Sequence, residues 1–276
     1  MSQMMLSYID RPSPVHRLSG ATKFIIFFLW AILAMTTFDA RILLVMSLFG
    51  ITAFIISGTK IAEVSFIFKL LLVFMAINLL GIYAFAPEQG VEIYGSRHVI
   101  WDGIGRYTLT WEQLYYETNV FLKYVVVVPV AILLMVTTHP SEFASSLNRI
   151  GVNYSIAYAI SLTLRYIPDV QRDYQDISRA QQARGIELSK KVSLYKRLKG
   201  AVAILMPLIF SSLERIDTIS HAMELRSFGK KKRRTWYSGK PFTRRDAVVL
   251  VVTLLLFALG LYLTFRSGTR FHNPFT

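Results

Sequence analysis

The sequence predicts an all-α integral membrane protein with about five transmembrane helices and a long basic segment before the last of them. Hydrophobic residues make up 53% of the 276 residues and charged residues only 17%, whereas soluble domains average about 25% charged residues. Several apolar runs approach or reach the roughly 20 residues that cross a bilayer as a helix. The third observation is the net charge of +14. Most of this charge lies in the basic segment that precedes the last span.

Five apolar runs are the predicted spans. The only charged residues within them lie towards span ends and are Lys23, Lys69 and Lys123. These runs cover residues 21–37, 42–57, 64–85, 119–137 and 247–265. Two shorter runs, 152–167 and 201–213, either cross the membrane or lie at its surface. The sequence contains no cysteine, which excludes a disulfide scaffold and thiol chemistry.

The distribution of charge predicts the orientation. Residues 138–246 contain 20 Lys or Arg against 9 Asp or Glu, while the loop 87–118 has two basic and five acidic residues. Because basic residues collect in cytoplasmic loops, we expect 138–246 in the cytoplasm and 87–118 outside, with a cytoplasmic N-terminus and an external C-terminus. The expected regions are 1–137 with four spans, 138–246, and 247–276 with the last span and an external tail. The glycines and aromatic residues of the external loop are typical of a short hairpin.

Two amphipathic helices are predicted in the cytoplasmic segment, over 169–183 and 208–228. Their apolar positions recur every three or four residues, at Val170, Tyr174, Ile177 and at Leu213, Ile216, Ile219, Met223. The first helix ends in Ala183-Arg184-Gly185 and the second in Leu225-Arg226-Ser227. A cation is favourable at a helix C-terminus by itself, but two such ends 42 residues apart indicate two equivalent docking points. A guanidinium suits a socket lined with carboxylates or carbonyls.

An ordered set of motifs resembles the transmembrane (T) component of energy-coupling factor (ECF) type ABC transporters. The set is densest over 139–229 and consists of Ser13-Pro14-Val15-His16-Arg17-Leu18 with Lys23, Pro140-Ser141-Glu142-Phe143, Leu164-Arg165-Tyr166-Ile167-Pro168, Arg179-Ala180-Gln181-Gln182-Ala183-Arg184-Gly185 and Ala222-Met223-Glu224-Leu225-Arg226-Ser227-Phe228-Gly229. The second Arg motif departs from the family's common Ala-Arg-Gly, because it has Leu225 and Ser227 around Arg226.

The resemblance implies a membrane part and a cytoplasmic coupling region of long crossing helices. It also implies that each Arg motif docks on one of two ABC-type ATPase subunits, which bind ATP, so the chain itself needs no cofactor. The apolar helix faces would hold a small membrane substrate-binding (S) subunit for vitamin or metal-ion uptake, and ATP-driven motion would pass through the coupling helices. The apolar composition adds the lipid bilayer as a partner, and for so apolar a chain we expect no nucleic-acid partner.

Two other functions remain open at this stage. Asp169, Asp173 and Asp176 share a helical spacing that a membrane enzyme could use for acid–base or Mg²⁺ chemistry, although Arg172 and Arg179 between them favour ion pairing. A self-contained secondary transporter is the other alternative, and few charges within the spans weaken it. The chain has no P-loop, no paired histidines and no nucleophile motif, so we expect no catalytic or metal site and no enzyme activity of its own. The basic run 230–234 either binds anionic lipid headgroups or only anchors the last span.

Overall fold

The computed structural model describes residues 11–103, 105, 107–186, 193–230, 235–236, 239–266 and 268–275. The chain forms two compact units, one made of Met1–Glu142 with Lys240–Thr276 and the other of Phe143–Gly239. The second unit lies within the region 138–246 that the charge distribution marks out, and its cytoplasmic location stays a prediction. Residues 231–234 of the basic run lie outside the described residues.

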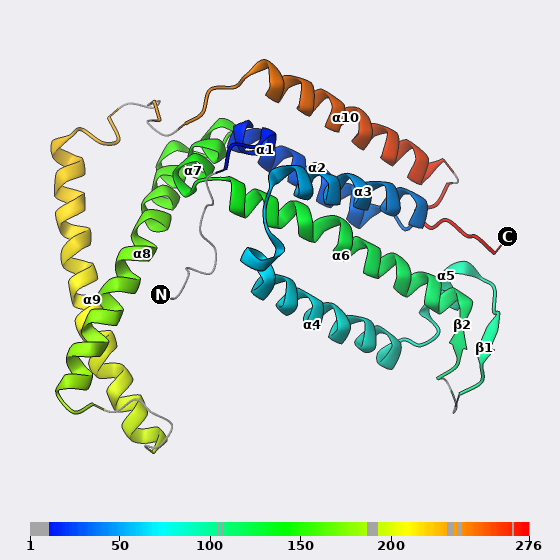
Figure 1. Cartoon of the computed structure of the whole chain (residues 1–276), viewed down its shortest axis with the longest axis horizontal. Helices are drawn as coiled ribbons and strands as arrows, with labels where there is room; N and C mark the ends of the chain where they lie inside the picture. The colour runs from blue at the N-terminus through cyan, green and yellow to red at the C-terminus, as the bar shows by residue number, and fades with distance from the viewer. Residues whose placement is uncertain are drawn as a thin grey trace. The chain divides into compact units, whose positions relative to one another are not determined.

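The first unit is a bundle of long helices with a short helix and a two-stranded hairpin at one end (Figure 1). Its elements are α1 (Pro14–Arg17), α2 (Gly20–Thr36), α3 (Ala40–Ser57), α4 (Ile61–Phe85), α5 (Gln89–Tyr94), β1 (Val99–Trp101), β2 (Leu109–Thr110), α6 (Trp111–Thr137) and α10 (Arg244–Phe265). The strands β1 and β2 pair antiparallel, which confirms the short hairpin expected in the loop 87–118.

Four of these helices, α3, α4, α6 and α10, are long and apolar enough to cross a membrane, and α2 is a shorter apolar helix of 17 residues. The fold is therefore the all-α membrane protein that the composition predicts. The largest difference from the predicted spans is in α6, which begins at Trp111 rather than at 119. Thr110 caps it by accepting a hydrogen bond from the Gln113 backbone N–H, and its polar first turns carry no hydropathy signal.

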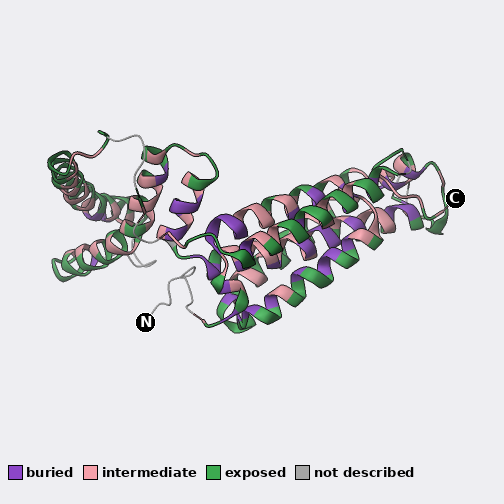
Figure 2. Cartoon of the chain, turned by 90° about the horizontal axis from the view of Figure 1, so that it is seen from above, coloured by how far each residue is buried: buried purple, intermediate pink, exposed green. Residues whose placement is uncertain are grey.

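Helix α6 is the centre of the bundle, because α2, α3, α4 and α5 all pack against it. Its buried residues contribute to two apolar clusters, which contain Leu33, Leu43, Met46, Leu122 and Val126 in one and Phe54, Val64, Ile132, Leu133 and Val136 in the other. Figure 2 shows this pattern as buried positions along the inner faces of helices whose outer faces are exposed. Apolar side chains on the outer faces are expected where helices contact the hydrocarbon core of a bilayer.

Lys123 lies inside this bundle rather than extending to the interface. Its side chain is buried, and its Nζ donates a hydrogen bond to the Met35 carbonyl at 3.1 Å and lies 3.2 Å from the centre of the Phe38 ring. The C-terminal carbonyls of a helix carry partial negative charge, and the ring face adds a cation–π contact. The ammonium group thus links α6 to the end of α2.

Two buried carboxylates bind the N-terminus of α2. Gly20 donates its backbone N–H to Glu142 at 2.8 Å, and Ser19 donates its own to Asp246, also at 2.8 Å. Glu142 also pairs with Lys240 at 3.0 Å. Free N–H groups and the positive end of the helix dipole favour carboxylates at this position. The start of the first apolar helix is therefore tied to residues more than a hundred positions later.

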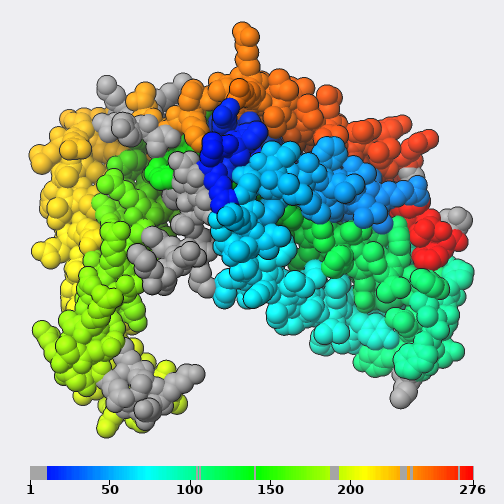
Figure 3. All heavy atoms as spheres, in the orientation of Figure 1, coloured from blue at the N-terminus to red at the C-terminus, as the bar shows by residue number. Residues whose placement is uncertain are grey.

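The face of the bundle seen in Figure 3 is formed by α1, α3 and α4, with α10 along its edge. Helix α10 packs chiefly on α2, where Gly260 allows a close approach. A Cβ at this position would lie 2.6 Å from Leu33 Cδ2, so a larger residue would push the two helices apart.

The second unit contains two long helices, α8 (Tyr154–Ala183) and α9 (Leu194–Leu225). A shorter helix, α7 (Pro140–Arg149), begins in the first unit and ends in the second. Helices α8 and α9 run antiparallel, contact each other and cross in the view of Figure 1. Both begin well before the predicted starts at 169 and 208 and contain an internal proline, Pro168 in α8 and Pro207 in α9.

Candidate partner-docking site

The two predicted Arg motifs lie at the C-terminal ends of α8 and α9, and both ends have the same backbone hydrogen bonds. At α8, the Ile186 N–H donates to the Gln181 carbonyl at 3.0 Å, and the Gly185 N–H donates to the Gln182 carbonyl at 2.9 Å. At α9, Phe228 donates to Met223 at 3.0 Å and Ser227 donates to Glu224 at 2.9 Å. This six-residue pattern is the Schellman motif, which satisfies the last carbonyls of a helix.

Each arginine is the C-cap residue of its helix, and the next residue has a left-handed conformation. Arg184 and Arg226 have φ values of −85° and −89°, and Gly185 and Ser227 follow with φ values of +87° and +54°. Gly185 adopts its left-handed conformation without strain, because it has no Cβ. The serine at the second end has the same type of conformation, although a Cβ makes it costly.

The side chains around both ends are exposed. Ala183, Arg184, Gly185, Leu225 and Arg226 all lie on the surface, and Ser227 is half-buried. Leu225 is 87% exposed, which is unusual for a leucine in a well-packed helix end. Each motif therefore presents an arginine and a small or apolar neighbour to whatever binds there.

The predicted apolar positions lie on α8 and α9, and the crossing covers them only in part. Ile177, Ile219 and Met223 are half-buried. Val170, Tyr174, Leu213 and Ile216 are exposed, at 36 to 56%.

Helix α9 has a longer exposed apolar surface than the predicted stripe. Its additional exposed side chains are Leu194, Tyr195, Leu198, Val202, Leu205, Met206, Ile209 and Phe210. Val202, Leu205, Met206, Ile209 and Phe210 belong to the apolar run 201–213, which by sequence either crosses the membrane or lies at its surface. In the structure this run is part of the 32-residue helix α9. In the described part of the chain, α9 is not among the helices whose length and hydropathy suit a membrane span.

Polar contacts fix where the two helices cross. Arg215 donates a hydrogen bond to Asp173 at 2.6 Å, and the same guanidinium lies 5.8 Å from the centre of the Tyr166 ring. Gln181 donates to the Ala203 carbonyl at 3.2 Å. The periodic pattern does not mark Arg215 as a crossing residue, because it does not show which residues of two helices meet.

An aromatic cluster holds the end of α9 against the start of α8. Phe228 packs on Tyr158 with a ring-centre distance of 4.7 Å, and Trp236 packs on Tyr154 at 5.4 Å. Trp236 also donates its indole N–H to the Asn148 side chain at 3.2 Å. Residues that follow the second Arg motif thus fix the position of that motif relative to α8.

The three aspartates of α8 are all engaged in ion pairs. Asp169 pairs with Arg172 at 3.6 Å and Asp176 with Arg179 at 3.7 Å, as their i, i+3 spacing predicts, while Asp173 pairs across the crossing. Among the residues that the structure describes, no group of three or more His, Asp or Glu could hold a metal ion. This arrangement gives no support to acid–base or metal chemistry on α8.

Comparison with known proteins identifies the family. The sequence pattern of the family described as CbiQ, cobalt transport protein, matches residues 11–237, which is most of the chain. This chain belongs to the CbiQ family.

Curated relatives of this CbiQ-family chain match it over nearly its full length. It is 27% identical over 271 residues to the energy-coupling factor transporter transmembrane protein EcfT of Exiguobacterium sibiricum, covering 95% of this chain and 97% of the relative. It is 26% identical over 273 residues to the EcfT of Bacillus subtilis, covering 95% and 98%. The predicted identity as the transmembrane component of an ECF-type transporter is confirmed.

Proposed function

We propose that this CbiQ-family chain couples ATP hydrolysis by two ABC-type ATPase subunits to the movement of a separate membrane S subunit. Arg184 and Arg226 are the two points at which the ATPases dock, each with its flanking residues. The apolar faces of α8 and α9 hold the S subunit, which takes up a vitamin or a metal ion. ATP binds to the partners and not to this chain.

The matching ends of α8 and α9 are the observation that carries this proposal. Two helix ends 42 residues apart in sequence share the same hydrogen-bond pattern and the same arginine position. Many helices end in this backbone motif, so the weight of the proposal lies on the side chains. Both ends place an exposed arginine at the C-cap position, next to an exposed alanine or leucine, which fits two equivalent grooves, one on each ATPase.

The exposed apolar surface of α9 supports a second partner. Soluble monomers rarely expose large contiguous apolar patches, and those that occur usually mark interaction sites. Ile209 and Leu213 are about half exposed and lie four residues apart on the helix, and Phe210 between them is 66% exposed. A membrane protein with its own apolar surface would cover them.

The crossing gives these two functions a mechanical connection. Because Arg215 and Asp173 join the helices at the crossing, a displacement of either arginine end moves both helices and the apolar surface they carry. ATPases that change their separation between nucleotide states would bind the two ends differently in each state, and only such differential binding can drive a conformational change.

The test is co-purification of the tagged chain from its native membrane in four forms. Wild type should capture two ATPase chains and a small membrane protein. Arg184→Ala with Arg226→Ala should lose the ATPases, and Arg184→Lys should recover only part of the capture, because a lysine cannot form a bidentate contact. Ile209→Gln with Leu213→Gln should lose the S subunit and retain the ATPases.

The matched control is Arg172→Ala with Lys199→Ala, which removes one exposed cation from each of the two helices, each far along its own helix from the Arg motif at that helix's end. If the control loses the ATPases as completely as the variant of Arg184 and Arg226, charge and not docking explains the capture. If the variant of Arg184 and Arg226 keeps its ATPases, the docking assignment is wrong.

A further inference from the structure

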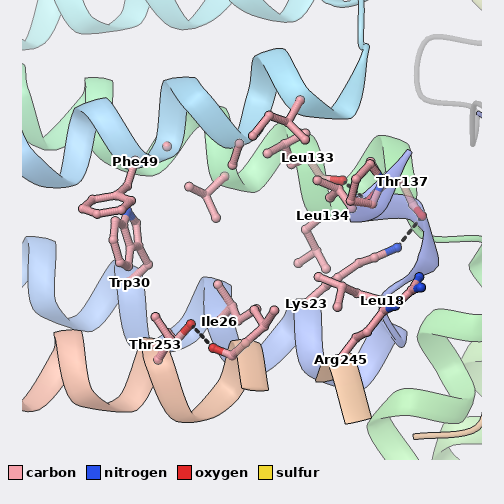
Figure 4. A pocket seen from close by; sticks show the side chains of 18 of the residues that line it. Leu18, Lys23, Ile26, Trp30, Phe49, Leu133, Leu134, Thr137, Arg245 and Thr253 are labelled. Carbon is pink, nitrogen blue, oxygen red and sulfur yellow. Dashed lines mark hydrogen bonds between the residues drawn. The ribbon is translucent and has the colours of Figure 1, made fainter. Parts of the chain in front are cut away.

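The first unit contains a large cavity that the coupling function does not use. It has a volume of about 920 Å³ and lies among α1, α2, α3, α6 and α10, and this volume is typical of small-molecule sites, which measure about 300–1,000 Å³. Apolar side chains form most of its wall, among them Ile26, Trp30, Phe49, Leu133, Val252 and Leu256. Figure 4 shows Ile26, Trp30, Phe49 and Leu133 around a central space, with Trp30 and Phe49 at one end.

The opposite end of the cavity is basic. Arg17, Lys23, Arg244 and Arg245 line it, and no Asp or Glu is among the residues of its wall. Lys23 donates a hydrogen bond to the Thr137 carbonyl at 2.7 Å (Figure 4). The three arginines form no ion pair with any residue in the described part of the chain.

These cations occupy positions that helix formation disfavours. Arg244 and Arg245 are the first two residues of α10, and Lys23 lies in the first turn of α2. The N-terminus of a helix carries partial positive charge, so cations there are repelled. The neighbouring carboxylates Glu142 and Asp246 interact favourably with the charge of Lys23, and Glu142 also pairs with Lys240. The arginines at this end are left without a carboxylate partner among the described residues. An additional anion at this end would relieve the repulsion.

The length of the cavity matches one leaflet of a bilayer. Its residues on α10 run from Arg244 to Leu256, which is about 18 Å of helix at 1.5 Å per residue. The hydrocarbon core of a bilayer is about 30 Å thick, so the cavity extends from the basic interface to near the bilayer centre. A slot that is basic at the interface and apolar below it has the polarity of an anionic lipid.

We propose that this cavity binds an anionic phospholipid, with its phosphate at Arg17, Lys23, Arg244 and Arg245 and an acyl chain against α2, α6 and α10. A free phosphate would leave the apolar walls empty, and a neutral lipid would leave the guanidiniums without a counter-charge. The bound lipid joins α10, which packs chiefly on α2, to the rest of the bundle. This site is independent of the Arg184 and Arg226 motifs.

Fluorescence quenching by phospholipids with brominated acyl chains tests the proposal on the full chain purified in detergent. Trp30 lies in the cavity wall and reports a bromine that enters it. Brominated phosphatidylglycerol should quench saturably, and Trp30→Phe should remove the saturable part, leaving the signal of Trp101, Trp111 and Trp236. Brominated phosphatidylcholine should need at least tenfold more lipid. Soluble glycerol phosphate should not compete at concentrations comparable to the lipid.

Two variants separate charge from shape. Arg244→Gln with Arg245→Gln should weaken phosphatidylglycerol binding about fivefold for each guanidinium removed, whereas Lys196→Gln with Lys199→Gln, on the exposed surface of α9, should leave it unchanged. Ala53→Phe should fill part of the cavity and abolish saturable quenching without changing the charge.

Equal quenching by the two lipids would overturn the proposal, and so would unchanged binding in the Arg244 and Arg245 variant. Efficient competition by glycerol phosphate would show a site for small anions instead of a lipid. Because the arginine variant removes cations from a helix N-terminus, it should fold at least as well as wild type, so it decides the question even if Ala53→Phe does not fold.

Discussion

Ser227 is a single residue held in a strained backbone conformation at the end of α9. It is the only non-glycine residue with positive φ in the described part of the chain, and it takes the position that Gly185 takes at the end of α8. A left-handed conformation costs an L-residue roughly 1–2 kcal/mol. The chain therefore keeps the geometry around Arg226 even where the sequence departs from Ala-Arg-Gly.

Exchange of these two residues gives a matched pair of stability predictions. Ser227→Gly should raise the free energy of unfolding by about 1 kcal/mol because it removes the strain, and Gly185→Ser should lower it by a similar amount. Reversible denaturation of the purified chain in mixed micelles measures both. A Ser227→Gly protein that is less stable than wild type would contradict the backbone geometry described for this helix end.

Glu142 is a second residue that the structure explains, because it binds the start of α2 and pairs with Lys240. Glu142→Gln leaves an acceptor for Gly20 but removes the charge, and we expect a loss of about 1–3 kcal/mol, as for other buried charged hydrogen bonds. Glu88→Gln is the control, because Glu88 forms an ion pair with Arg97 at the surface and such pairs contribute about 0–1 kcal/mol. Equal effects of the two substitutions in the same denaturation assay would show that Glu142 has no special role.

At the scale of elements, the crossing of α8 and α9 depends on a contact between residues 42 positions apart. Asp173 and Arg215 are about one third exposed, so solvent screens their interaction. A double-mutant cycle with Asp173→Asn and Arg215→Gln should give a coupling energy of about 0.5–1 kcal/mol.

The same cycle on Asp176 and Arg179 is the control for the crossing. That pair lies within α8, is about three quarters exposed and has a separation of 3.7 Å, so its coupling should be within about 0.5 kcal/mol of zero. If the two cycles give the same value, the Asp173–Arg215 pair does not hold the crossing. Thermal denaturation of the single and double variants provides the four free energies for each cycle.

At the scale of the whole molecule, the orientation in the membrane is the main prediction. The chain has no native cysteine, so a single introduced cysteine is the only thiol that a maleimide can label. In intact cells a membrane-impermeant maleimide should label Asp102→Cys in the loop 87–118 and Thr269→Cys after α10. It should label Thr218→Cys on α9 only after permeabilisation. Labelling of Thr218→Cys in intact cells would reverse the predicted orientation.

The sequence by itself determined the fold class, the approximate spans and both Arg motifs. These are local properties: hydropathy over about 20 residues, a 3.6-residue period and a short motif at a helix end. The helix starts were less predictable. Pro168 and Pro207 interrupt the sequence pattern, yet α8 and α9 continue through them, because each proline removes only one hydrogen bond and tertiary packing supports the rest.

Only the tertiary structure decided which distant residues meet. It brought Glu142 and Asp246 to the start of α2, Arg215 to Asp173, and the cations of α1, α2 and α10 to one end of an apolar cavity. The physical reason is that a local pattern specifies which face of a helix is apolar. The choice of a partner for that face depends on the packing of the whole chain.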